Sequence, residues 1–430
     1  MSSGSRLTND LNGNLMNQTS IETDKKAPAL AISALMKTLF IALFAQLQLI
    51  LFASLASSKA PLFVSKIRLQ VDFEDFYIAT ADWLHGLDPY ARLDQFLYHR
   101  FNKPAPVLLL ALPLQRFSEH TAAYIFYVAN IVAVVFSLWG ISRYFRLSRN
   151  ESLLFFGISS MYLPAIFVIE RGNLDGFMLA FIVMSLILKN PFAKGIAQGI
   201  SVGLKLYTAL LLLPLTITRR WKQALALFVV SSALFLSFHS LFMSFIHSQM
   251  ARSAENYLFE NICPAALAGI FTSFGETTLF KLIYLALWFL SYMSVIVRYR
   301  KASVERLTIY SLPWMMAFPF LVLPYTGVLL LPVMVLRIRE MGARGFLTIY
   351  DRMFLAGFFL IGFQPLAMTT YFMWLTHSHQ FFYVFNPLGT TLVLCSLTFG
   401  PTEERSTYVP TASRLGSEGT AAPSTRTAWS

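Results

Sequence analysis

The stretch from Val71 to Tyr90 reads VDFEDFYIATADWLHGLDPY and places four aspartates and a glutamate between apolar regions. Asp72 and Asp75 lie three residues apart, so a helix would carry both carboxylates on one face. Asp72 also stands where we expect the edge of the bilayer, and a carboxylate near lipid is costly unless it is paired or used. Asp72 is therefore a candidate functional residue, whereas a solvated face is the simpler explanation for Glu74 and Asp82.

Two cations, Arg171 and Lys205, lie among apolar residues, where a lone charge is expensive. Lys205 could bind an anionic group, or it could extend its amine toward the membrane interface. Arg171 could bind an anion as well, or it could pair with Glu170 or Asp175. The sequence leaves these alternatives open.

We expect no metal ion. His377 and His379 occupy alternate positions of THSHQ, which diverge on a helix, and no acid lies close to them in sequence. A zinc site needs three or four converging ligands. The acid-x-acid spacing of Asp72 and Glu74 suits a metal in a strand but splays in a helix. Either histidine could still hydrogen-bond a sugar or a phosphate.

The composition is that of an integral membrane protein. Of 430 residues, 56% are hydrophobic and only 13% are charged, against roughly 25% charged in soluble domains. The formal charge of +12 comes from short basic clusters between apolar runs. This is the pattern of cytoplasmic membrane loops, and it lacks the continuous basic surface that binding to nucleic acid requires. We therefore expect a lipid bilayer as partner and no nucleic acid.

A helix needs about 20 apolar residues to cross the hydrocarbon layer. The clear candidates for such spans are 34–57, 121–142, 152–169, 174–188, 223–243, 279–297, 353–374 and 381–399.

Three other apolar runs depend on where the basic clusters lie. If all the clusters are cytoplasmic, 195–218 and 307–336 must each be a hairpin of two segments, with outer vertices near Lys205 and Pro324-Tyr325. The short run 104–115 then lies on the outer surface as a juxtamembrane helix. A single span at 195–218 is the alternative, but it would move the last three basic groups outside.

The expected fold is an all-α, polytopic transmembrane helical bundle of about twelve spans with both termini cytoplasmic. We expect disordered cytoplasmic tails at 1–30 and 401–430 around a transmembrane domain at 31–400. A large first outer loop, 58–120, would carry juxtamembrane helices, and the polar loops would gather on the extracytoplasmic face.

The acidic stretch resembles the first outer loop of the C-type glycosyltransferases. The pattern Asp72-Phe73-x-x-Phe76-Tyr77-x-Ala79, followed by Trp83-Leu84-x-Gly86-x-Asp88-Pro89-Tyr90, is most similar to family 87, the polyprenol-phosphate-mannose-dependent mannosyltransferases. GNLDGFMLAFIVMSLIL, GIAQGISVGLKLYTALLLLPL and RRW follow in the family's order. The chain departs from the family in having Ala105 at a Pro-Pro site, and an acidic Glu74-Asp75 pair where an apolar residue is usual.

The resemblance implies a C-type fold and specific roles for the candidates. Asp72 would be the general base, with Asp75 in reserve, because a lipid phosphate is a good leaving group and only the acceptor hydroxyl must lose a proton. Lys205 and Arg171 would bind the donor phosphate. The candidates for substrate binding are Tyr77, Asp88, Tyr90, Asn173 and Asn261.

The expected reaction moves a hexose, mannose by resemblance, from a polyprenyl-phosphate donor to an acceptor hydroxyl with inversion and without a cofactor. The acceptor could be a glycolipid, a glycan or a protein, and the expected location is the plasma membrane. A secondary transporter or lipid-carrier flippase is the alternative, but such proteins keep charges near the midplane, often in repeats, and the spans here are almost free of charge. A non-catalytic membrane scaffold is a second alternative, and its function would not depend on any single acid of the outer loop.

Overall fold

The computed structural model describes residues 71–91, 101, 103–254, 264, 278–318, 324–363 and 385–401. The chain divides into two compact units, Met1–Gly400 and Pro401–Ser430. The predictions for the N-terminal tail, the 34–57 span, Asn261, His377 and His379, and the C-terminal tail after Pro401 lie outside the described residues.

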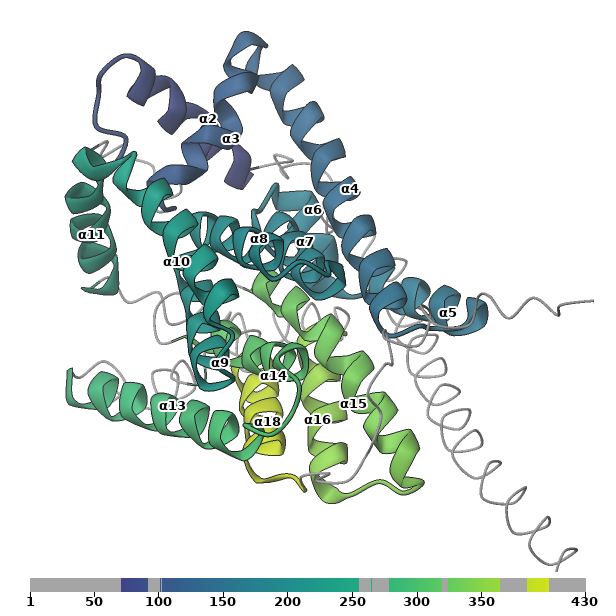
Figure 1. Cartoon of the computed structure of the whole chain (residues 1–430). Helices are drawn as coiled ribbons and strands as arrows, with labels where there is room; N and C mark the ends of the chain where they lie inside the picture. The colour runs from purple at the N-terminus through teal and green to yellow at the C-terminus, as the bar shows by residue number, and fades with distance from the viewer. Residues whose placement is uncertain are drawn as a thin grey trace, which may run out of the picture. The chain divides into compact units, whose positions relative to one another are not determined.

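The described residues form helices and no strand, which confirms the all-α class for this part of the chain. In chain order (Figure 1) the elements are α2 (Val71–Leu84), η1 (Ala105–Val107), α3 (Leu108–Ala111), η2 (Leu112–Arg116), α4 (Glu119–Tyr144), α5 (Arg149–Ser160), α6 (Leu163–Arg171), α7 (Asp175–Ile187), α8 (Pro191–Leu204), η3 (Leu206–Leu211), α9 (Leu212–Ile217), α10 (Trp221–Leu236), α11 (His239–Ala254), α13 (Thr278–Arg298), α14 (Val304–Met316), η6 (Pro324–Leu329), α15 (Leu330–Arg344), α16 (Ile349–Gly362) and α18 (Phe385–Phe399).

Helices α8 and α10 pack closely and run parallel, side by side in Figure 1. Gly195, Gly199 and Gly203 recur every four residues on α8. A Cβ added at each would lie 2.3–2.8 Å from the nearest atom of α10. The α10 residue that it meets lies later in the chain at each step, so the two helices run in the same direction. Small residues allow two membrane helices to approach to backbone contact. Gln223 Nε2 also donates to Gln198 Oε1 at 2.9 Å across the interface.

The parallel packing means that the chain must return between α8 and α10. Helix α8 ends at Leu204, Lys205 is extended with φ −147° and ψ 111°, and η3 and α9 carry the chain back before Trp221 begins α10. The direction therefore reverses at Lys205, as the predicted hairpin requires. The total of about twelve crossings stays a prediction.

Two expected spans contain a sharp bend. The pair formed by α5 and residues Leu163–Ile169 bends by 67°, and α10 with His239–Ser248 bends by 90°. Pro164 in the first turn of α6 has no N–H to continue the hydrogen bonds of α5. Ser237 Oγ donates to the Ala233 carbonyl at 2.9 Å, which competes with extension of α10.

Among the described residues, α4 is the helix long and apolar enough to cross a membrane by itself, and the number rises to three when each bent pair counts as one span.

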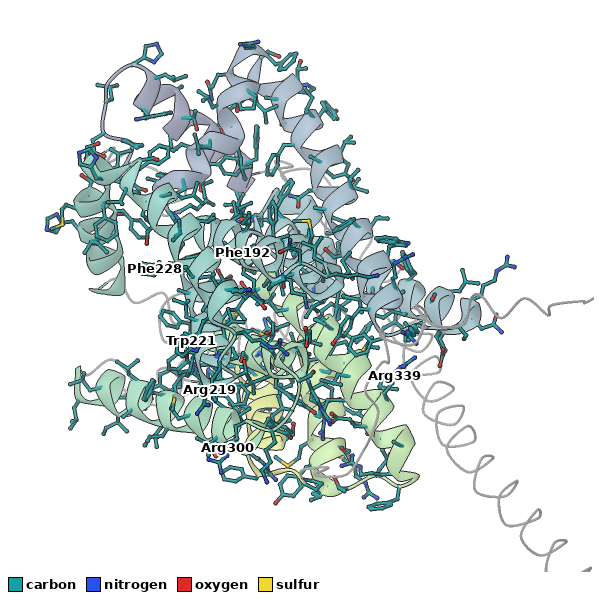
Figure 2. The ribbon with its side chains drawn as sticks, in the orientation of Figure 1. Phe192, Arg219, Trp221, Phe228, Arg300 and Arg339 are labelled. Carbon is teal, nitrogen blue, oxygen red and sulfur yellow. The ribbon has the colours of Figure 1, made fainter. Side chains whose placement is uncertain are left out.

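The outward face of α10 is apolar. Trp221, Leu225 and Phe228 are 61%, 59% and 57% exposed and recur at helical spacing, and Arg219 precedes them (Figure 2). A contiguous apolar stripe of this kind is unfavourable in water and favourable in lipid, and tryptophan beside arginine is typical of the membrane interface. The surface therefore supports a membrane location.

A buried charge network joins α14, α15 and α16, in which Arg306 and Tyr310 of α14 donate to Glu340 of α15. Arg337 is 1% exposed and donates to Glu340 at 2.9 Å and to Asp351, at the N-terminal end of α16, at 2.7 Å. Arg344 donates to the other Asp351 oxygen at 2.6 Å, and Thr348 donates to the same oxygen at 2.7 Å. Burial raises the pKa of Asp351, but the hydrogen bonds from Thr348 and Arg344 and the charge of Arg337 outweigh it, so the pKa lies below its ordinary value.

We expect Arg337→Met to lower the free energy of unfolding by about 3–5 kcal/mol, because removing one partner of a buried pair leaves the other charge uncompensated. The thermal midpoint of the purified protein in detergent measures the loss. Arg352→Met is the matched control, since Arg352 is exposed on the first turn of α16. Equal losses in the two variants would contradict the role given to the network.

Candidate active site

Helix α2 presents Asp72 from a fixed backbone. Phe73 and Phe76 are 1% and 0% exposed, and their rings lie 4.8 and 5.1 Å from the ring of Phe126 on α4. These contacts anchor the helix against α4. Asp72 itself is only 6% exposed, so its carboxylate needs partners inside the protein.

The turn between α6 and α7 supplies those partners. Gly172 adopts the left-handed conformation with φ 68°, which ends α6 and turns the chain at Asn173. Asn173 Nδ2 donates to Asp72 Oδ2 at 2.6 Å, and Arg171 Nη2 lies 3.5 Å from Asp72 Oδ1. The structure thus brings together three predicted site residues, and it places the Arg171 guanidinium beside Asp72.

Arg171 and Asp72 differ in exposure. The Arg171 side chain is 42% exposed and that of Asp72 is 8% exposed. The guanidinium can therefore reach a ligand from the surface while it also contacts the carboxylate. Such an arrangement can bind an anion beside a proton acceptor.

A second charge pair lies two residues further along the same turn. Asp175 is fully buried, and its Oδ2 is 3.4 Å from Lys205 Nζ at the break after α8. Tyr207 OH donates to Asp175 Oδ1 at 2.7 Å, and the Asp175 N–H donates to Asn173 Oδ1 at 3.1 Å. Lys205, predicted to bind phosphate, therefore has a carboxylate partner and is joined to the Asp72 group through Asn173.

The reserve base Asp75 also has a cation beside it. Its Oδ2 lies 3.6 Å from Lys103 Nζ, and that amine is 6.0 Å from the centre of the Phe76 ring. The sequence pattern did not single out Lys103 or Tyr207, and it indicated Asp175 only as a partner for Arg171. Each of the three residues lies within or close to a segment that resembles family 87, and this position was the sequence feature that could have identified it.

The other described candidates, Tyr77, Asp88 and Tyr90, make contacts that brace the segment between α2 and α4. Tyr77 OH donates to the Phe117 carbonyl at 2.8 Å, and Tyr90 OH donates to the Lys103 carbonyl at 2.8 Å. The Tyr90 N–H donates to Asp88 Oδ1 at 2.9 Å, which closes a turn around Pro89. Their predicted contacts with substrate stay predictions.

Within the part of the chain that the structure describes, no group of three or more His, Cys, Asp or Glu side chains could hold a metal ion. The expectation of a reaction without metal stays a prediction.

The chain matches the sequence model of a known family. The sequence model of glycosyltransferase family 87 matches residues 101–324, which is more than half of the chain. Arg171, Asn173, Asp175 and Lys205 lie inside this range, and Asp72 precedes it. A search of curated proteins found no match.

We expect Lys205→Met to destabilise the fold by about 3 kcal/mol, because it removes a cation from the fully buried Asp175. Adding Asp175→Asn removes the charge that needed a partner and keeps the acceptor for Tyr207, so the double variant should recover most of the loss. Thermal unfolding in detergent measures both. A double variant as unstable as Lys205→Met alone would show that the pair is not what stabilises this region.

Proposed function

The chain belongs to glycosyltransferase family 87, and from this premise we propose that it moves a hexose, mannose first among the candidates, from a polyprenyl-phosphate carrier to an acceptor hydroxyl. The reaction takes place at the extracytoplasmic face of the plasma membrane. Donor and bilayer are its partners, the acceptor is a glycolipid, a glycan or a protein, and no cofactor takes part.

The observation that carries this proposal is the setting of Asp72. One oxygen accepts a hydrogen bond from the neutral Asn173 amide at 2.6 Å, and the other faces Arg171 at 3.5 Å. These contacts fix the direction of both carboxylate oxygens beside a partly exposed cation, and an ionised carboxylate can accept a proton. Asp72 is therefore proposed as the general base.

Arg171 is proposed to bind the phosphate of the donor. Its side chain is 42% exposed and its guanidinium already lies beside the proposed base. A guanidinium can donate two parallel hydrogen bonds to a phosphate, and a positive charge there stabilises the phosphate as it departs. Lys205 is proposed as a second cation, and Asp175 fixes the position of its amine.

The bond changes balance without an added reactant. The acceptor oxygen forms a bond to the anomeric carbon while the bond from that carbon to the phosphate oxygen breaks. The electron pair of the broken bond leaves with the lipid phosphate, and the acceptor proton passes to Asp72. Because the attack comes from the side opposite the leaving group, the configuration inverts.

We expect Asp72→Asn to lower transfer by about 10²–10⁴-fold, the usual contribution of a general base. The measurement is incorporation of label from a radiolabelled polyprenyl-phosphate mannose into glycans of host membranes that lack the native protein and express the variant.

Asp82→Asn on the same helix is the control for removing an acid, and Asp75→Asn tests the reserve base. Unchanged transfer by Asp72→Asn at normal expression would eliminate Asp72 as the base. No transfer by the unmodified protein from any polyprenyl-phosphate sugar would eliminate the proposed donor class.

Arg171→Gln should raise the KM for the donor by about 10- to 100-fold, the range expected when one hydrogen bond to a charged group is lost. Titration of labelled donor at fixed membrane protein measures it. A KM equal to that of the unmodified protein would remove Arg171 from the phosphate site.

A further inference from the structure

Asn130 is a buried polar residue in the middle of α4, which among the described helices is long and apolar enough to cross a membrane by itself. Its side chain is 0% exposed. Its Nδ2 donates to the Asn173 carbonyl at 3.0 Å and to the Val168 carbonyl at 3.4 Å. Both acceptors belong to the region in which α6 ends and turns toward α7.

The Asn130 side chain closely fits this location. A Cβ on Gly176 would lie 2.6 Å from Asn130 Oδ1 and 2.9 Å from Val168 Cγ1, so only glycine leaves room for the amide. Asn130 Oδ1 accepts no hydrogen bond within the described part of the chain. A buried amide with an unsatisfied oxygen costs folding free energy, which indicates that its two donated bonds serve another purpose.

The turn to which Asn130 donates carries Asn173, the residue that donates to the proposed base Asp72. The Asn173 N–H donates to the Val168 carbonyl at 3.0 Å, so Asn130 and the Asn173 backbone share one acceptor. From this backbone the Asn173 side chain reaches Asp72 at 2.6 Å and accepts from the Asp175 N–H at 3.1 Å. A displacement of the Asn173 backbone would move both contacts together.

We propose that Asn130 is a positioning residue, which holds the Val168–Asn173 turn so that the Asn173 amide stays bonded to Asp72 and keeps that carboxylate ready to accept a proton. This inference rests on the proposed function. It assigns to α4 a role in the reaction although Asn130 does not touch Asp72.

The test is the pH dependence of mannosyl transfer by Asn130→Leu in host membranes, with labelled polyprenyl-phosphate mannose as donor. A carboxylate that loses a hydrogen-bond donor binds its proton more tightly. The acid limb of the kcat/KM profile should therefore move to higher pH by roughly half to one unit. A merely structural role would lower the amount of active protein and leave the limb where it is.

Ser137→Ala is the matched control, because Ser137 is buried on the same helix and its hydroxyl donates to the Ala133 carbonyl within that helix. Gly176→Ala tests the same contact from the other side, since its new Cβ displaces the Asn130 amide, and it should shift the limb in the same direction.

The inference would be overturned if a variant that accumulates in the membrane, whether Asn130→Leu or Gly176→Ala, kept its acid limb at the pH of the unmodified protein. Absence of transfer by the unmodified protein would instead overturn the proposed function, so the two failures are distinguishable.

Discussion

A carboxylate that is 6% exposed must find its compensation within the protein. Asp72 finds it 99 and 101 residues away, at Arg171 and Asn173. This interaction fixes the N-terminal end of α2 against the α6–α7 turn. In the same turn Asn173 accepts a hydrogen bond from the Asp175 N–H, and the Asp175 carboxylate lies beside Lys205. The polar site is therefore one connected set of contacts.

The helices around this set are held by means that suit a lipid-exposed protein. Glycines allow α8 to approach α10 to backbone contact, and α8 ends at Leu204, directly before the extended Lys205. Phenylalanine rings lock α2 on α4. The buried Arg337–Asp351 pair links α15 to α16. The Arg171–Asp72 pair differs because the Arg171 side chain stays partly exposed, as a ligand site requires.

Hydropathy predicted the helical class and the reversal of the chain at Lys205. Residue type and spacing singled out Asp72, Arg171 and Lys205 as candidates, and the family resemblance added Asn173, while the roles of all four stay predictions. These features could not predict the pairing, because contacts across a hundred residues depend on how helices dock. Asp175 was considered only as a partner for Arg171, since an acid at a helix N-terminus is ordinary. The bends at α5–α6 and α10–α11 were missed because an apolar run records length and not direction.

The most direct measurement is a structure of the full-length protein with a polyprenyl-phosphate sugar bound. The account predicts phosphate oxygens within hydrogen-bonding distance of the Arg171 guanidinium, with the anomeric carbon on the side of Asp72 and room between them for an acceptor hydroxyl. A donor bound elsewhere, with Asp72 still enclosed by Asn173 and Arg171 and remote from the sugar, would contradict it.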